Sequence, residues 1–334
     1  MNPAIRCTPS FKTTDYGNSP EFDFLDYPKN DVDASKSKGM PISELESADQ
    51  YKIRLANINL LSFSISFKGT IGRQQENLHK NRYPDVIPND ESRVILKHTQ
   101  TSDYINASWY GEEAILTQGP MYNTKSDLWL MAFENNGIII CVTDQYDSGL
   151  KEKTTNYWDK VTEFIPSLSA SCGFSVDDAF IEVPKDYAVE DITLGLTVIP
   201  IGIPETVISH SDQEIIRSAF EVTLGNEKKT LYRLYLKNWP DMGTCSSKLV
   251  VKLIDLFPED LTPIIHCSAG IGRAGVVAIA NHFIKAYNQN GTIPTEDEID
   301  AEIIKLRKER PGIIQKYEQR QLITKAILKH ISSK

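Results

Sequence analysis

Residues 264–275 read I-I-H-C-S-A-G-I-G-R-A-G, and they constrain the fold of this chain more than any other stretch. An apolar run precedes them and a helical pattern follows, so the sequence predicts a buried strand, a tight loop and a helix. Glycines at 270 and 272 let successive backbone N–H groups turn inward, and the helix start adds a partial positive charge. We expect this loop to hold an anion, with Arg273 gripping two of its oxygens.

Cys267 stands at the start of this loop, directly after the predicted strand. Positive neighbours and backbone N–H groups lower the pKa of a thiol, so we expect this cysteine to react as a thiolate. A cysteine and an arginine separated by five residues are weak evidence alone, but here His266 precedes the cysteine and small residues line the loop. The pattern favours transfer of a phosphoryl group to sulfur, which needs positioning and charge neutralisation and no metal.

Length and composition narrow the classes of protein that fit. The chain has 334 residues, is 40% hydrophobic and carries a formal net charge of -9, which argues against general binding to nucleic acid. Its five cysteines show no paired spacing, so we expect neither a disulfide framework nor a zinc cluster. Because no stretch of 18 apolar residues occurs, we expect no membrane span.

The chain is interpreted as an extension followed by one domain. Residues 1–41 are rich in Pro, Ser, Asp and Lys and predict an N-terminal extension, while 42–334 predict the catalytic domain. We expect Ser43 to cap the first helix of the domain. Beyond it, strands alternate with helices, which predicts an α/β fold with a twisted mixed sheet flanked by helices. Residues 160–205 are less regular and predict β-hairpins in an elaborated region.

A second candidate group lies in the sequence N-W-P-D-M-G, which carries one carboxylate, Asp241. Attack of a thiolate on a phosphate ester requires an acid that protonates the leaving oxygen. Trp239 and Pro240 make a rigid loop edge and Gly243 provides a hinge, so Asp241 is the candidate acid. Alone, W-P-D is equally an ordinary turn before a helix.

Seven blocks of the chain resemble, in order, the phosphotyrosine-specific protein tyrosine phosphatases. They are K-N-R-Y-P-D-V-I-P-N-D-E-S-R-V-I-L (80–96), D-Y-I-N-A-S (103–108), I-L-T-Q-G-P (115–120), N-Y-W (156–158), W-P-D (239–241), H-C-S-A-G-I-G-R (266–273) and R-P-G-I-I-Q-K-Y-E-Q (310–319). The resemblance implies a single catalytic domain of that family's fold, no metal or other cofactor, and phosphotyrosine-containing proteins as partners. The sequence leaves the oligomeric state open.

The resemblance also implies catalytic roles at the matching positions. Cys267 would form the cysteinyl-phosphate and Arg273 would hold the phosphate. Asp241 would protonate the tyrosine oxygen and then activate water for the second step. Gln315, with Gln319 nearby, would place that water.

Further positions would bind the substrate. Tyr83 would stack against the substrate ring and set the depth of the pocket, while Asp85 would accept hydrogen bonds from the substrate backbone. The loop residues that would surround the phosphate are Ser268, Ala269, Gly270, Ile271 and Gly272. A pocket of this depth excludes phosphoserine, whose phosphate cannot reach the floor.

The chain departs from the family pattern at Ala274, where a Ser or Thr is usual. Without that hydroxyl the sulfur loses one hydrogen bond, so we expect slower breakdown of the phosphoenzyme and reduced turnover. The alternative is a pseudophosphatase that binds phosphotyrosine and traps substrates. A phosphoinositide phosphatase would call for basic residues in the signature loop, and this loop contains no lysine. Met242 and Cys245 also replace the residues that the family favours.

The expected chemistry indicates a compartment. A reactive thiolate survives in a reducing environment, so we expect the protein in the cytoplasm. The Lys-, Asn- and Ile-rich composition and the loose match to the family also fit a microbial effector delivered into a host cell, if the source is a pathogen.

Overall fold

The computed structural model describes residues 39–99, 102–160, 162–166, 180–240, 243 and 245–334. Within this part of the chain, Gly39–Lys334 belong to one compact unit. Asp241 and Met242 lie outside the described residues, and so do the first 38 residues of the expected extension.

Six α-helices occur among the described residues. They are α1 (Ala48–Phe63), α2 (Lys125–Glu134), α3 (Ser247–Ile254), α4 (Arg273–Asn290), α5 (Glu296–Glu309) and α6 (Tyr317–Ile331). The strands are β1 (Arg93–Ile95), β2 (Tyr104–Tyr110), β3 (Ala114–Thr117), β4 (Gly137–Cys141), β5 (Thr162–Pro166), β6 (Phe180–Pro184), β7 (Val189–Asp191), β8 (Leu196–His210), β9 (Gln213–Leu224), β10 (Glu227–Leu236) and β11 (Thr262–His266). Short 3-10 helices span Ile71–Arg73, Leu78–Lys80 and Tyr122–Thr124.

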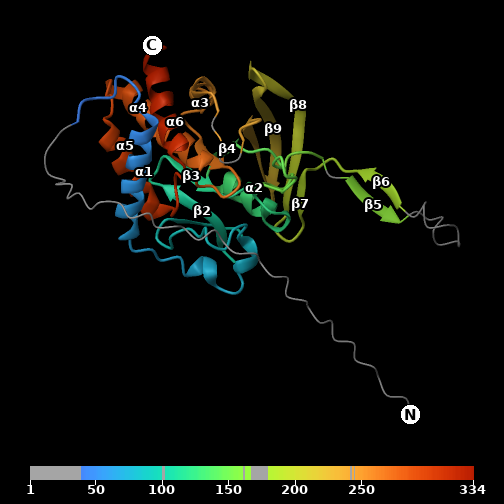
Figure 1. Cartoon of the computed structure of the whole chain (residues 1–334). Helices are drawn as coiled ribbons and strands as arrows, with labels where there is room; N and C mark the ends of the chain where they lie inside the picture. The colour runs from blue at the N-terminus through green and yellow to red at the C-terminus, as the bar shows by residue number, and fades with distance from the viewer. Residues whose placement is uncertain (1–38, 100–101, 161, 167–179, 241–242, 244) are drawn as a thin grey trace. The chain divides into compact units, whose positions relative to one another are not determined.

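Nine of these strands form one sheet in the order β1-β2-β3-β11-β4-β10-β9-β8-β7 (Figure 1). The four central strands β3, β11, β4 and β10 run parallel, and the outer pairs are antiparallel. The carboxyl ends of the central strands therefore meet at one edge, where loops carry functional groups in folds of this kind. The predicted mixed α/β sheet flanked by helices is confirmed.

The two faces of the sheet are buried by different helices. Ile138, Ile140 and Ile265 pack into one apolar cluster with α3, α4, α5 and α6. Ile139 and Ile264 pack into a second cluster with α2 on the opposite face. This alternation follows from the period of two along a strand. The next two side chains, those of His266 and Cys267, therefore point to opposite faces of the sheet.

The region expected to hold β-hairpins does so. β5 pairs with β6 in a separate two-stranded sheet, and β7 pairs with β8 in the large one. β8 and β9 are long strands that pair along most of their length. No helix in the described part of the chain is long and apolar enough to cross a membrane.

The first helix begins later than the sequence analysis predicted. Ser47, and not Ser43, is the N-cap of α1. The Ser47 hydroxyl accepts a hydrogen bond from the Gln50 backbone, and the Gln50 side chain accepts one from the Ser47 backbone. The prediction of Ser43 was wrong although both serines stand three residues before a Glu or Gln, the pattern of a capping box. Glu46, the partner that Ser43 would need, accepts two hydrogen bonds from Arg54, whereas Gln50 completes the box with Ser47.

Replacing Ser47 with alanine should lower the free energy of unfolding by about 1 kcal/mol, because the first turn of α1 loses its side-chain cap. Urea denaturation followed by circular dichroism measures this change. Ser43→Ala is the matched control and should change the free energy by less than about 0.5 kcal/mol, since Ser43 is exposed and outside the helix. Equal losses in the two variants would contradict this assignment.

Candidate active site

The loop that follows β11 forms the floor of the site. Cys267 is the first residue after the strand and is 3% exposed, and its Sγ accepts a hydrogen bond of 3.3 Å from the Gly270 backbone N–H. Gly270 adopts a φ of 74°, and a Cβ at this position would collide with the Thr117 carbonyl. The loop ends at Gly272, the N-cap of α4, so the helix N-terminus faces the cysteine as the sequence predicted.

Every backbone carbonyl from His266 to Gly272 accepts a hydrogen bond from outside the cradle. The donors are the Val142 N–H for His266, the His266 ring for Cys267, the Gly119 N–H for Ser268, Arg310 for Ala269 and Gly270, the Ile314 N–H for Ile271 and the Val276 N–H for Gly272. With the carbonyl oxygens held outside, the N–H groups of the loop are oriented toward the anion site. This arrangement is the one that a preorganised oxyanion site requires.

Arg310 holds two of these carbonyls from beneath the loop. Its side chain is fully buried, and its guanidinium lies 2.8 Å from the Gly270 oxygen and 2.9 Å from the Ala269 oxygen. It also donates to the side chains of Asn106 and Ser108. Burial lowers the pKa of Arg310 to about 10, so the side chain stays charged at neutral pH. The sequence analysis assigned no role to Arg310.

Arg273 opens α4 and is buried beside the cysteine loop. Its guanidinium donates a hydrogen bond of 2.8 Å to the Trp239 carbonyl, which ties Arg273 to the W-P-D segment. Trp239 is fully buried and donates from its indole to the Gly243 carbonyl. The loop edge thus has the rigid base that the sequence predicted, and Asp241, the candidate acid, remains a prediction.

Tyr83 lies at the rim of the cradle. Its hydroxyl is 2.8 Å from the Ser268 hydroxyl, and the Lys151 ammonium lies 5.8 Å from its ring centroid. The neighbouring Arg82 is anchored by three backbone carbonyls, so the position of the tyrosine loop is fixed. Asp85 follows two residues later and is exposed, as a group that binds substrate backbone would be.

Two glutamines lie on the other side of the loop. A Cβ at Gly272 would stand 2.7 Å from Nε2 of Gln319 and 3.1 Å from Oε1 of Gln315, so both side chains lie directly over this glycine. The Gln319 oxygen accepts from the Gln315 backbone N–H at 2.9 Å, which sets the position of the exposed Gln315. Ala274 is fully buried one residue after Arg273.

His266 and Tyr157 support the loop from the α2 face of the sheet. The Tyr157 hydroxyl lies 2.6 Å from Nε2 of His266, and Nδ1 of His266 lies 3.2 Å from the Cys267 carbonyl oxygen. Burial raises the pKa of Tyr157 well above its usual value, so this hydroxyl keeps its proton. Neither residue received a role in the sequence analysis, although each lies within one of the seven quoted blocks.

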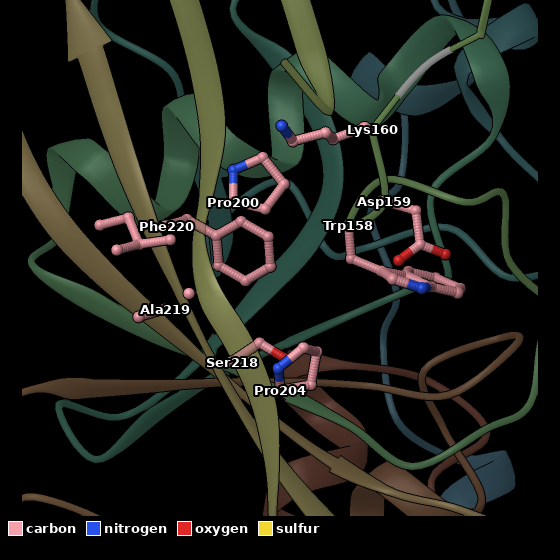
Figure 2. A pocket seen from close by; sticks show the side chains of 10 residues that line it. Trp158, Asp159, Lys160, Pro200, Pro204, Ser218, Ala219 and Phe220 are labelled. Carbon is pink, nitrogen blue, oxygen red and sulfur yellow. The ribbon is translucent and has the colours of Figure 1, made fainter. Parts of the chain in front are cut away.

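A separate hollow lies beside β8 and β9 (Figure 2). Pro200 and Phe220 lie on one side of it and Trp158 and Asp159 on the other. It contains none of the residues of the cysteine loop. Among the described residues, no group of three or more His, Cys, Asp or Glu side chains is arranged to hold a metal ion.

Cys245 lies between the W-P-D segment and α3. It is half-buried, packs against the apolar cluster beside α4, and burial raises the pKa of its thiol. These properties are those of an unreactive structural cysteine.

The fold and the loop together define a mixed α/β domain in which a buried cysteine begins a loop with outward-held carbonyls at the N-terminus of a helix. The family model described as protein-tyrosine phosphatase matches residues 77–183 and 196–329. Since these ranges cover more than half of the sequence, the chain belongs to the protein-tyrosine phosphatase family, and the resemblance noted in the sequence is confirmed.

Several curated proteins are similar to this chain. Human tyrosine-protein phosphatase non-receptor type 12 is 32% identical over 274 residues, which is 77% of this chain and 30% of that protein. Human type 18 is 29% identical over 264 residues, 74% of this chain and 50% of that protein. Tyrosine-protein phosphatase 1 of Dictyostelium discoideum is 28% identical over 252 residues, 69% of this chain and 44% of that protein. The chain thus spans half or less of the length of these relatives.

A solved structure has the same fold. The crystal structure of the catalytic domain of human protein tyrosine phosphatase non-receptor type 18 matches with a TM-score of 0.67 and 23% sequence identity. The match covers 84% of this chain and 96% of that one.

Gly270→Ala should abolish anion binding, because the added Cβ has no room between the Thr117 carbonyl and the Arg310 guanidinium. The measurement is protection of Cys267 from iodoacetamide by inorganic phosphate, scored on the labelled peptide by mass spectrometry. Gly291→Ala is the matched control, since Gly291 also has a positive φ of 72° but no atom within 4 Å of the added Cβ. It should cost about 1 kcal/mol of stability and leave protection unchanged. Full protection in Gly270→Ala would contradict the proposed cradle.

Proposed function

We propose that this chain is a protein tyrosine phosphatase that hydrolyses phosphotyrosine through a cysteinyl-phosphate intermediate. The observation that carries the proposal is the loop of seven outward-held carbonyls, which surrounds the buried thiol of Cys267 with N–H groups and Arg273. Family membership and the names of the similar proteins support the same activity. The substrates are phosphotyrosine-containing proteins, and a reactive thiolate assigns the activity to a reducing compartment such as the cytoplasm.

In the first step the Cys267 thiolate attacks phosphorus. The S–P bond forms as the bond between phosphorus and the tyrosine oxygen breaks, and Asp241 gives its proton to the departing phenolate oxygen. Arg273 and the loop N–H groups neutralise the charge on the transferred oxygens. The hydrogen bond between Arg273 and the Trp239 carbonyl supports this role, because it links phosphate binding to the position of the acid loop.

In the second step water attacks phosphorus and the S–P bond breaks. Asp241, now a carboxylate, takes a proton from that water, and inorganic phosphate leaves with the thiolate restored. Gln315 orients the water. Its position over Gly272, fixed by Gln319, supports this role.

Selectivity for phosphotyrosine follows from the depth at which the Cys267 thiol lies below the surface. Cys267 is 3% exposed, and Tyr83 lies at the rim with its hydroxyl on Ser268. An aryl phosphate spans this depth and stacks on the Tyr83 ring, whereas the shorter phosphoserine does not reach the thiolate. Asp85 is exposed beside Tyr83, where it can accept hydrogen bonds from the substrate backbone.

A second candidate function rests on Ala274. This residue is fully buried and supplies no hydroxyl to the sulfur, so a phosphoenzyme that breaks down slowly would trap its substrate. A chain of this kind would act as a phosphotyrosine-binding pseudophosphatase. Turnover is the measurement that separates the two functions.

The purified chain should hydrolyse p-nitrophenyl phosphate and phosphotyrosine peptides, and it should spare phosphoserine peptides. Cys267→Ser should abolish hydrolysis, because the nucleophile is lost. Asp241→Ala should lower kcat for the phosphotyrosine peptide by about 10²–10⁴-fold, and by less for p-nitrophenyl phosphate, whose leaving group needs less protonation. Tight phosphopeptide binding without a burst or turnover would favour the pseudophosphatase instead.

Ala274→Ser should accelerate hydrolysis of the phosphoenzyme by roughly tenfold, because a regained hydrogen bond to the leaving sulfur is worth about 1–3 kcal/mol in a dry site. Single-turnover kinetics with rapid quench isolates this step. Ala278→Ser is the matched control, since Ala278 is also buried on α4, one turn further along. No gain in Ala274→Ser would remove the explanation for slow turnover.

A further inference from the structure

A buried arginine lies beside His266 and Tyr157 on the α2 face of the sheet. Arg233, on β10, is 2% exposed, and its guanidinium carbon lies 4.3 Å from the centroid of the Trp158 ring and 4.6 Å from that of Tyr235. Its Nε lies 3.1 Å from the Tyr157 hydroxyl oxygen. The aromatic rings stabilise the buried charge, so the arginine is held in one place.

Arg233 and the Cys267 carbonyl stand at the two ends of this chain of hydrogen bonds, and they set the direction of the bonds between them. An arginine can only donate, so the Tyr157 oxygen accepts from Arg233. We assign the proton of Tyr157 to its bond with Nε2 of His266, 2.6 Å away. A neutral imidazole that accepts at Nε2 carries its proton on Nδ1. That proton is donated to the Cys267 carbonyl oxygen, 3.2 Å away, which can only accept.

The Cys267 carbonyl is the one carbonyl of the loop whose donor can exist in a non-donating form. Of the other six carbonyls, four accept from backbone N–H groups and two accept from Arg310. Both kinds of group are always donors. If His266 carried its proton on Nε2, the Nδ1 lone pair would face the carbonyl oxygen and repel it. The oxygen would then turn toward the cradle, where it opposes both the thiolate and the phosphate.

Cys141 and Tyr235 are the remaining titratable groups of this cluster. Cys141 pairs in register with both His266 and Tyr235 across the central strands. Tyr235 donates to Asp144, and burial together with this carboxylate raises the pKa of Tyr235. Cys141 also hydrogen-bonds to His266, Tyr157 and Arg233. Burial raises the pKa of the Cys141 thiol, but the neighbouring His266 and Arg233 outweigh burial and lower it to about 6. Tyr235 faces Arg233 through its ring.

We infer that Arg233 is a positioning residue for the nucleophile: through Tyr157 it selects the tautomer of His266 that holds the Cys267 carbonyl out of the cradle. Arg233 does not touch the substrate. It acts on the same loop as Arg310, from the opposite side and through two intermediaries. The expected effect of Arg233 on turnover rests on the proposed function. The expected effect on the reactivity of the Cys267 thiol does not.

The experiment measures alkylation of Cys267 by iodoacetate as a function of pH, with the labelled peptide identified by mass spectrometry so that Cys141 is scored separately. Arg233→Met should raise the pH midpoint of alkylation by about one unit, because a turned carbonyl disfavours the thiolate. Steady-state hydrolysis of p-nitrophenyl phosphate should lose about tenfold in kcat with little change in KM.

A double-mutant cycle separates this route from a direct effect of charge. Tyr157→Phe should raise the midpoint by itself, and adding Arg233→Met to it should produce no further shift, because the relay is already broken. An equal shift from Arg233→Met in both backgrounds, or none in the wild-type background, would overturn the inference. Arg320→Gln is the matched control, since Arg320 is also fully buried but pairs with Glu296 and Asp300. It should leave the midpoint unchanged.

A measurement on the unmodified protein keeps the inference testable if Arg233→Met fails to fold. Nitrogen-15 NMR of the imidazoles should show His266 as the Nδ1-protonated tautomer at neutral pH. A spectrum with the proton on Nε2, or on both nitrogens, would overturn the inference. If alkylation and NMR behave as expected while phosphotyrosine hydrolysis is absent, the proposed function fails and the positioning role of Arg233 remains.

Discussion

The outward orientation of the loop carbonyls is the constraint on which the rest of the site depends. A backbone that points successive N–H groups at one anion must point its carbonyls elsewhere, and each buried carbonyl then needs a donor. Arg310 meets this need for two consecutive residues, Ala269 and Gly270, with a single charged side chain. Neighbouring strands and loops supply most of the rest. The fold can therefore be understood as a frame that brings donors to one short loop.

The sequence predicted those parts of the site that are encoded locally. Cys267, Gly270 and Arg273 lie within seven residues, and the strand, loop and helix that position them follow directly from apolar runs and glycines. The order of α/β elements and the hairpins after Trp158 were predictable for the same reason. These signals need no knowledge of distant partners.

The sequence did not reveal the residues that support the cysteine loop from distant parts of the chain. Arg310 lies 40 residues from Gly270, and its role depends on how α5 ends against the sheet. One signal was available, since Arg310 continues the apolar stripe of Ile299, Ile303 and Leu306 at helical spacing. Arg233 gave no such signal, because its partner Tyr157 comes from a segment 76 residues earlier and only tertiary packing joins them. Ser47 was missed because both Ser43 and Ser47 fit the capping-box pattern, and the ion pair of Glu46 with Arg54 is not readable from the sequence.

The alternation of side chains along β11 continues into the residue after the strand, and this places His266 and Cys267 in different surroundings. Cys267 packs in the apolar cluster of α3, α4, α5 and α6, whereas His266 meets Tyr157 in the cluster beneath α2. The two environments share only the backbone of the strand. Through the role inferred for Arg233, substitutions on the α2 face retune the reactivity of the thiol during evolution without altering any contact to substrate. Specificity and reactivity are free to diverge independently in such a domain.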